Sequence, residues 1–264
     1  MGNFQNFLNL AVKAAFKAGK VLKKGFDLEK EIIFKRFADP VTLYDKESEK
    51  IIVDQILSNH PDHSILTEEN LSRDVNKDYK WIIDPLDGTV NFTHKIPYIS
   101  ISIALEINQQ VVLGVVYNPV LDEIYTAIQG AGAFMNKKRL SVSNISSIGK
   151  ALVATGFPYE RDGRIEELMK PMPAFLKDYQ GYRRLGSATM DLVYVARGSF
   201  DGFYEENLKP WDTAAGKIIV EEAGGKLTDY SNNPYSVYQK TIIASNSLIH
   251  NQIVDLLKDV KKPD

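Results

Sequence analysis

Two aspartates follow an apolar segment in the first half of the chain. Trp81-Ile82-Ile83 leads into Asp84, and Pro85-Leu86 separates Asp84 from Asp87, which Gly88-Thr89 follow. Carboxylates are rarely buried unless they are paired or bind a metal, and strand ends often carry sites because a rigid element aims the ligands. Two carboxylates, a hydroxyl group and free backbone amides together suit hard cations and a phosphate group. The stretch therefore predicts a site for both.

Four further segments place polar groups where helices or strands should begin or end. They are Thr67-Glu68-Glu69 after an apolar pair, Asp45, Gly186-Ser187-Ala188, and residues 211–216 with the sequence Trp-Asp-Thr-Ala-Ala-Gly. Helix N-termini attract phosphate because their N–H groups are unpaired and the helix dipole is positive there. The small residues that follow Thr213 would let a helix starting near Asp212 pack close to the site.

The elements that position these residues can be expected from the periodicity of the first half. Helical spacing predicts an amphipathic helix over residues 4–26 and a second helix that Thr42 and Asp45 begin and that stops before Pro61. Strand-like alternation then predicts strands at 99–105, 111–117 and 123–128, joined by short turns into an antiparallel meander. His60 and His63 flank Pro61, and we interpret them as surface residues of a loop.

From about residue 150 strands and helices alternate. We expect strands at 151–155, 200–205, 226–228 and 241–245, and helices at 162–177, 188–197, 211–223 and 248–258. The chain therefore divides near residue 145 into an N-terminal α+β domain, 1–145, which carries the antiparallel sheet and most of the acidic residues, and a C-terminal α/β domain, 146–264.

Composition excludes several classes of protein. The 264 residues carry a net charge of −2, so no basic field favours nucleic acid as a partner. The chain lacks cysteine, which excludes disulfides and thiolate sites and fits a reducing compartment, so we expect a cytoplasmic protein. No segment approaches 18 uncharged apolar residues, so we expect neither a signal peptide nor a membrane partner.

Taken together, the motifs resemble those of the inositol monophosphatase family of magnesium-dependent, lithium-sensitive phosphatases. Residues 81–92 match the family's Trp…Asp-Pro-Ile/Leu-Asp-Gly-Thr-x-Asn-Phe motif, and residues 211–216 match its Trp-Asp-x-Ala-Ala-Gly motif. The resemblance covers essentially the whole chain. It implies a layered α-β-α-β-α sandwich of mixed α+β and α/β type, two or three Mg²⁺ ions and a homodimer.

The resemblance also assigns roles to the metal ligands. Glu68, Asp84 and the carbonyl group of Leu86 would hold the first magnesium, and Asp84, Asp87 and Asp212 the second. A third, weaker ion would lie near Glu68, with Asp45 beyond it. Independently, acidic side chains that converge without arginine or lysine repel one another, and oxygen ligands favour magnesium over zinc.

The remaining assignments concern catalysis and the substrate. Asp45, Glu68 and Thr89 would be catalytic, with Thr89 and Asp45 positioning the attacking water. The substrate-binding residues would be Asp87, Gly88, Thr89, Gly186, Ser187, Ala188, Glu205 and Asp212. Many relatives carry glycine in place of Thr67 and threonine in place of Ser187; neither departure removes a ligand, and both leave the substrate preference open.

Simpler interpretations stand beside these. Asp84 and Asp87 could cap a turn, N-capping accounts for Asp45 as well as catalysis does, and Glu205 could be an acid on a strand surface. For function, we expect Mg²⁺-dependent hydrolysis of a small phosphate monoester by metal-activated water, with inositol monophosphate first. Fructose 1,6-bisphosphate, NADP and 3′-phosphoadenosine nucleotides are alternative substrates. A non-catalytic ligand-binding module and a metal-free two-carboxylate glycosidase are alternatives of other classes.

Overall fold

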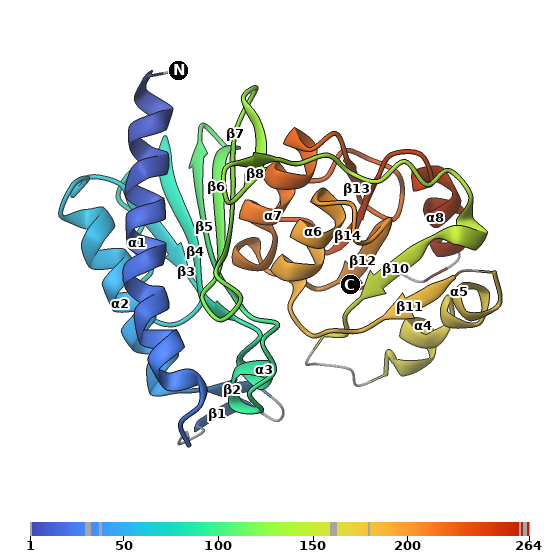
Figure 1. The fold of residues 1–264 in the computed structure, drawn as a ribbon, viewed down its shortest axis with the longest axis horizontal. Coiled ribbons are helices and arrows are strands. Elements are labelled where there is room, and N and C mark those ends of the chain that lie inside the picture. Colours follow the sequence, from blue (N-terminus) through green and yellow to red (C-terminus); the bar gives the residue numbers. More distant parts are fainter. Residues whose placement is uncertain are drawn as a thin grey trace.

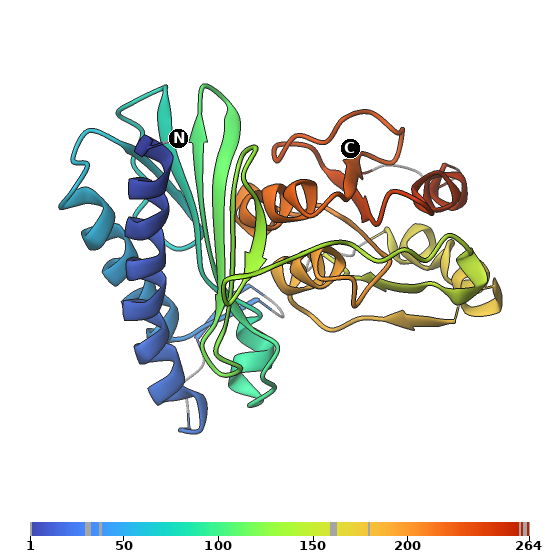
Figure 2. The same cartoon turned by 45° about the horizontal axis from the view of Figure 1, so that its top comes forward.

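Helices and sheets alternate in five layers, which confirms the expected α-β-α-β-α sandwich (Figure 1). The computed structural model describes residues 2–29, 33–36, 39–158, 163–178, 180–258, 260 and 263. In order, the layers are α1 (Gly2–Phe26) with α2 (Leu43–Leu57), a seven-stranded sheet, α6 (Ala188–Ala196) with α7 (Pro210–Glu222), a five-stranded sheet, and α4 (Ile165–Met169), α5 (Met172–Asp178) and α8 (His250–Leu257). The turned view shows α1 and α2 covering one face of the first sheet, while α6 and α7 lie against the other (Figure 2).

The first sheet contains the predicted meander. Its strands, in spatial order, are β3 (Ser64–Thr67), β4 (Tyr79–Asp87), β5 (Ser100–Ile107), β6 (Gln110–Asn118), β7 (Glu123–Ile128), β8 (Gly132–Met135) and β9 (Lys138–Arg139). Only β3 and β4 run parallel, while every other neighbouring pair is antiparallel. Side chains alternate along β5, so Ile101 and Ile103 pack with the core under α1 and α2, whereas Ala104 packs with the core around α6 and α7. Two short elements lie beside this sheet: the hairpin of β1 (Ile33–Arg36) and β2 (Asp39–Val41), and helix α3 (Thr89–Thr93).

The second sheet is mixed. Its spatial order is β11 (Gly181–Arg183), β10 (Leu152–Thr155), β12 (Gly202–Glu206), β14 (Thr241–Ser245) and β13 (Lys226–Thr228), and the short 3₁₀ helix η1 (Ile148–Lys150) precedes β10. Strand β10 runs parallel to both β11 and β12, whereas β14 is antiparallel to its two neighbours. The carboxyl ends of β10, β11 and β12 therefore meet at one edge, which is where open sheets of parallel strands commonly bind ligands.

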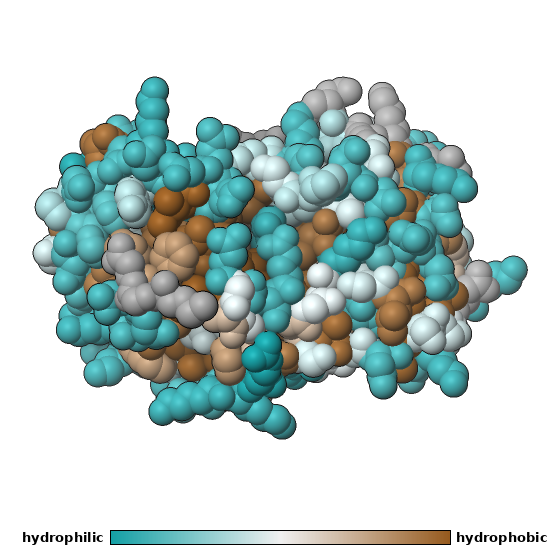
Figure 3. Space-filling model, turned by 90° about the horizontal axis from the view of Figure 1, so that it is seen from above, coloured by the Kyte–Doolittle hydropathy of each residue, from teal (hydrophilic) through white to brown (hydrophobic). Residues whose placement is uncertain are grey.

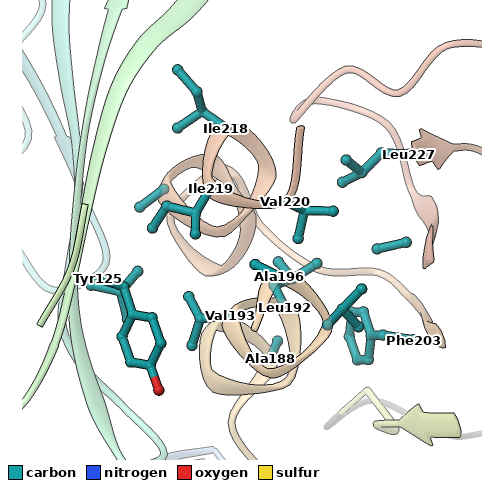
Figure 4. Close-up of a cluster of buried hydrophobic side chains, with 14 of the residues drawn as sticks. Tyr125, Ala188, Leu192, Val193, Ala196, Phe203, Ile218, Ile219, Val220 and Leu227 are labelled. Atoms are coloured by element: carbon teal, nitrogen blue, oxygen red, sulfur yellow. The ribbon is translucent and has the colours of Figure 1, made fainter. Parts of the chain in front are cut away.

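Small residues let α7 lie very close to its neighbours. A Cβ atom built on Gly114 of β6 would stand 2.7 Å from the carbonyl oxygen of Ala215, and one on Gly216 would stand 2.6 Å from Leu192 of α6. Figure 4 shows side chains of α6 and α7, Leu192 and Ile219 among them, filling the layer between the two sheets. The predicted reason for the small residues after Thr213 thus agrees with the packing.

Two expectations are wrong. The helix expected over 162–177 is broken into α4 and α5, because Pro171 lacks the N–H group that a continuous helix would need; residue 162 lies outside the described residues. His63 is buried: its Nδ1 accepts a hydrogen bond from Trp81 Nε1 (3.1 Å), and its ring stacks on that of Tyr79. The other boundaries agree to within two residues.

The division near residue 145 stays a prediction. The first sheet ends at Arg139 and the second begins at Leu152, but α6 and α7 of the second half bury the inner face of the first sheet. Hydrophilic side chains cover most of the face seen in Figure 3, with smaller apolar areas between them. None of the helices in the described part of the chain has the length and apolar character that a membrane span requires.

Candidate active site

The register of β3 and β4 places two acids at the same edge of the first sheet. Thr67 lies opposite Ile83 in this parallel pair, so Glu68 and Asp84 both follow at the carboxyl end. Asp84 is buried. Burial raises the pKa of the Asp84 carboxyl well above its ordinary value, and the charges of Glu68, Asp87 and Asp212 raise it further, in that order. Acids from three segments therefore feel one another's charge at this edge.

Local hydrogen bonds hold the turn between Asp84 and Asp87. The Leu86 N–H group donates to Asp84 Oδ1 (3.0 Å), and Ser48 Oγ on α2 donates to the Pro85 carbonyl (2.7 Å). The pairing of β4 with β5 shifts register between the two aspartates, so both belong to the strand rather than following it. Gly88 has a φ of +89°, and a Cβ there would lie 2.9 Å from the Tyr98 carbonyl oxygen, so glycine is needed for two reasons.

Thr89 and Asp45 are in contact. Thr89 Oγ1 lies 3.0 Å from Asp45 Oδ1 and 3.2 Å from the Leu86 carbonyl oxygen, so its single hydroxyl proton can go to either acceptor. The other carboxylate oxygen of Asp45 accepts from the N–H and hydroxyl groups of Thr42 and closes the capping box of α2. Burial raises the pKa of Asp45, and these hydrogen bonds oppose the increase. Asp45 thus caps α2 and also bonds the proposed catalytic hydroxyl.

The start of α6 is attached to Asp87. Asp87 Oδ2 accepts from Ser187 Oγ (2.6 Å) and from the Thr189 N–H group (2.8 Å), while Ser187 also caps α6. Burial raises the pKa of Asp87, and the hydrogen bonds from Ser187 and Thr189 partly oppose the increase. Gly186, Ser187 and Ala188 consequently lie beside a proposed metal ligand, and serine in place of threonine keeps the hydroxyl group that makes the contact.

Asp212 reaches the site from the first turn of α7. Its Oδ2 accepts from the Lys209 N–H group (2.7 Å), and its carbonyl accepts from Thr189 Oγ1 (2.8 Å), which ties α7 to α6. Burial, then Asp87, raises the pKa of Asp212 well above its ordinary value. Glu205 on β12 is buried, and its pKa is raised well above the ordinary value by burial and then by Asp191, Asp212 and Asp87. These hydrogen bonds and charge effects connect the acids of β4, α7 and β12 with the start of α6, while Asp45 joins from α2 through Thr89.

The donor atoms of the site are of the kind that binds a hard cation. The donors are carboxylate oxygens that share a poorly solvated region and repel one another, which is the situation a bound cation relieves. Ser100, opposite Asp87 in the sheet, has a buried hydroxyl with no hydrogen-bond partner among the described residues, as a missing water or ligand oxygen would leave it.

The side chains as placed do not form a complete set of metal ligands. Within the described ranges no three His, Asp or Glu side chains stand ready as a metal-binding group. Asp84, Asp87 and Asp212 each direct one oxygen to a backbone N–H group of the protein. The charges of Glu68, Asp84, Asp87 and Asp212 nevertheless act on one another, so these acids remain the candidate ligands.

Sequence reasoning missed residues that hold the site from a distance. Glu49 on α2 is buried and accepts from Thr67 Oγ1 and the Asn70 N–H group, both at 3.0 Å, and so fixes the loop that carries Glu68. Its position four residues after Asp45, on the same helix face as Ile52, was an available signal. Asn91 and Asp191 were also missed; Asp191 accepts from Tyr98 Oη (2.7 Å) beside Glu205.

A small cavity, of about 10 Å³, touches this site, where Glu205 and Gly156 line it. A cavity of about 380 Å³ lies at the other end of α7 from Asp212, lined by Lys217, Glu221 and Glu222 among others. The acidic residues, not the empty space, identify the candidate site.

Comparison with known proteins decides the family. The model of the inositol monophosphatase family matches residues 3–262. The chain belongs to this family. An inositol-1-monophosphatase of Mesorhizobium japonicum is 39% identical over 259 residues, which span 97% of this chain and 96% of that protein. The "Nus factor SuhB" of Haemophilus influenzae is 39% identical over 254 residues, 95% of each chain.

The fold agrees with that of solved members of the inositol monophosphatase family. An IMPase structure from Thermotoga maritima superposes with a TM-score of 0.89 at 38% identity and covers 97% of this chain and 98% of its own. Family membership points to a phosphatase, whereas the names of the relatives divide between an inositol monophosphatase and a Nus factor.

Proposed function

We propose that this protein hydrolyses small phosphate monoesters with magnesium and that inositol monophosphate is its leading substrate. The observation that carries the proposal is the convergence of Glu68, Asp87 and Asp212 on Asp84. Their charges raise the pKa of Asp84 beyond the effect of burial. A phosphatase needs positive charge to meet a phosphate, and an acidic site acquires it only by binding cations.

In this proposal Glu68, Asp84, Asp87, Asp212 and the Leu86 carbonyl hold two or three Mg²⁺ ions. Magnesium, when bound, would neutralise the acids, activate water and stabilise the leaving oxygen. Thr89 donates its proton to Asp45 and keeps lone pairs that can accept a hydrogen bond from the attacking water and so orient it. The backbone N–H groups of Gly88 and Thr89 bind the phosphate.

The alcohol part of the substrate would lie toward the second sheet. Gly186, Ser187 and Ala188 stand beside Asp87, and Glu205 projects from the parallel edge of that sheet into the same region. A carboxylate accepts several hydrogen bonds from hydroxyl groups, which suits a polyol such as inositol. The cytoplasmic location, the homodimer and the sensitivity to lithium stay predictions.

Relatives of similar identity carry different names, so similarity alone does not choose the substrate. The test is phosphate release from inositol monophosphate, fructose 1,6-bisphosphate, NADP, a 3′-phosphoadenosine nucleotide and p-nitrophenyl phosphate, with magnesium and then with EDTA. We expect the highest kcat/KM for inositol monophosphate, loss of turnover in EDTA, and recovery when magnesium is returned. No turnover of any ester would refute the proposal, and turnover that persists in EDTA would refute its dependence on metal.

A further inference from the structure

The carboxylate of Glu205 occupies the space beside Gly156 that a side chain would need. In the parallel pair of β10 and β12, Thr155 lies opposite Tyr204, so Gly156 and Glu205 are the next neighbours at the carboxyl edge of the sheet. A Cβ atom built on Gly156 would overlap both carboxylate oxygens and the Cδ atom of Glu205, closer than real Cβ atoms approach other atoms.

The reason for glycine at this position is space and not backbone conformation. Gly156 is absent from the glycines of positive φ, among them Gly88 and Gly186, so its backbone is open to any residue. The three atoms nearest to the built Cβ all belong to Glu205, the end of a flexible side chain. An alanine at 156 would therefore displace the carboxylate and leave the strand in place.

Displacement of the Glu205 carboxylate has few favourable directions. Glu205 is buried, and the charges that act on it most are those of Asp191, Asp212 and Asp87. A carboxylate pushed away from Gly156 changes its distance to these acids. The displacement therefore moves the carboxylate relative to Asp87 and Asp212, which belong to the same proposed site.

We propose that Gly156 is a positioning residue for Glu205 and that the pair determines how the alcohol part of the substrate is recognised. This inference rests on the proposed phosphatase function and on the substrate role of Glu205 in it. The missing side chain at 156 then acts on specificity, because it decides where the carboxylate meets the hydroxyl groups of the ester.

The experiment is a double-mutant cycle of Gly156→Ala and Glu205→Ala, measured with inositol monophosphate and with p-nitrophenyl phosphate, whose leaving group has no hydroxyl for Glu205. Gly156→Ala should raise KM for inositol monophosphate by about fivefold or more, change kcat little, and lower the preference for the polyol ester by a similar factor. In the Glu205→Ala background the same substitution should have almost no further effect, because its target is gone.

Gly181→Ala is the matched control. Gly181 lies on the neighbouring strand β11, and a Cβ there would meet only the ends of the Leu152 and Arg183 side chains. It should leave the kinetics of both esters unchanged, and thermal unfolding of every variant should show that it is folded.

Three results would overturn the inference: an equal effect of Gly156→Ala with and without Glu205, an equal loss for both esters, or wild-type kinetics in Gly156→Ala. If the wild-type protein hydrolyses no ester of the substrate panel, the proposed function fails and the inference fails with it. If the wild-type protein hydrolyses both and the cycle is additive, the inference alone fails.

Discussion

The isosteric substitution Asn91→Asp tests the connection between Gly88-Thr89, which we propose to bind phosphate, and Gly186-Ser187, which we propose to face the substrate alcohol. Asn91 lies in α3, which Gly88 precedes and Thr89 begins, and it is buried. Its Nδ2 donates to the carbonyl oxygens of Tyr98 and Leu185, both at 2.8 Å. Leu185 directly precedes the Gly186-Ser187 pair. Because both partners are pure acceptors, only an NH₂ group satisfies them, and a carboxylate of the same shape cannot.

The size of the effect follows from these two contacts. The substitution removes the two short hydrogen bonds, and a longer one to the Gly186 carbonyl (3.4 Å), and leaves the buried Tyr98 carbonyl and the part-buried Leu185 carbonyl facing an acceptor. The cost is about 1–3 kcal/mol for each short bond, or about 4 kcal/mol together. For a chain of this size that loss lowers Tm by roughly 10 °C. Since the displaced loop carries Ser187, which bonds Asp87, kcat/KM for inositol monophosphate should fall by about a hundredfold.

Thermal unfolding and steady-state kinetics of Asn91→Asp and the wild-type protein measure both effects. Protonation gives the new carboxyl group one donor, so the difference in Tm should narrow as the pH is lowered from about 8 to about 5. The control is Asn76→Asp, because Asn76 Oδ1 only accepts, from the Asp78 and Tyr79 N–H groups, and a carboxylate keeps that role. A Tm for Asn91→Asp within about 2 °C of the wild-type value would refute the reasoning.

Three further outcomes are expected. Asp87→Asn should lower kcat more than about a hundredfold and keep the fold by circular dichroism, since an amide oxygen still accepts from Ser187; activity near that of the wild type would exclude Asp87 as a ligand. Lithium should inhibit phosphate release at fixed magnesium, and an insensitive enzyme would speak against the second metal position. Burial, and to a lesser extent Lys226, lowers the pKa of His250 to about 4, below that of an unfolded histidine. The stability that His250 contributes above about pH 6.5 should therefore be lost as the pH falls toward 4. In urea unfolding, the free energy of unfolding of the wild type should fall by about 3 kcal/mol more than that of His250→Gln over this range, and a difference between the two that does not change with pH would contradict this.

The sequence predicted the parts of the site that short segments specify. The stretch from Asp84 to Gly88, the cap at Ser187 and the helix start near Asp212 each depend on a few adjacent residues. The structure places the cap and the helix start as expected and keeps Asp84 and Asp87 within β4. The layered fold followed from the two motifs and was confirmed. Periodicity was sufficient for the helices and strands because hydrophobic spacing and capping are local properties, whereas the layered fold came from the resemblance to the family.

The remainder depends on partners far along the chain. Glu49 reaches Asn70, Asn91 reaches Leu185, and Gly156 is explained only by Glu205, so no window of neighbouring residues contains the cause. His63 was misassigned for the same reason. Its position in a loop does not reveal that Trp81, eighteen residues later in the chain, donates a hydrogen bond to its ring. Side-chain contacts between distant segments determine these positions, and one sequence does not reveal them.

The position of α7 between the sheets also sets an order in time. At synthesis rates of about 5–20 residues per second, Asp84 leaves the ribosome on the order of ten seconds before Asp212. During that interval the strand face that α7 later covers, with Ile82, Ala104 and Val116, has no partner from its own chain. We therefore expect the nascent first sheet to expose this apolar face until the last third of the chain emerges, a condition that favours aggregation.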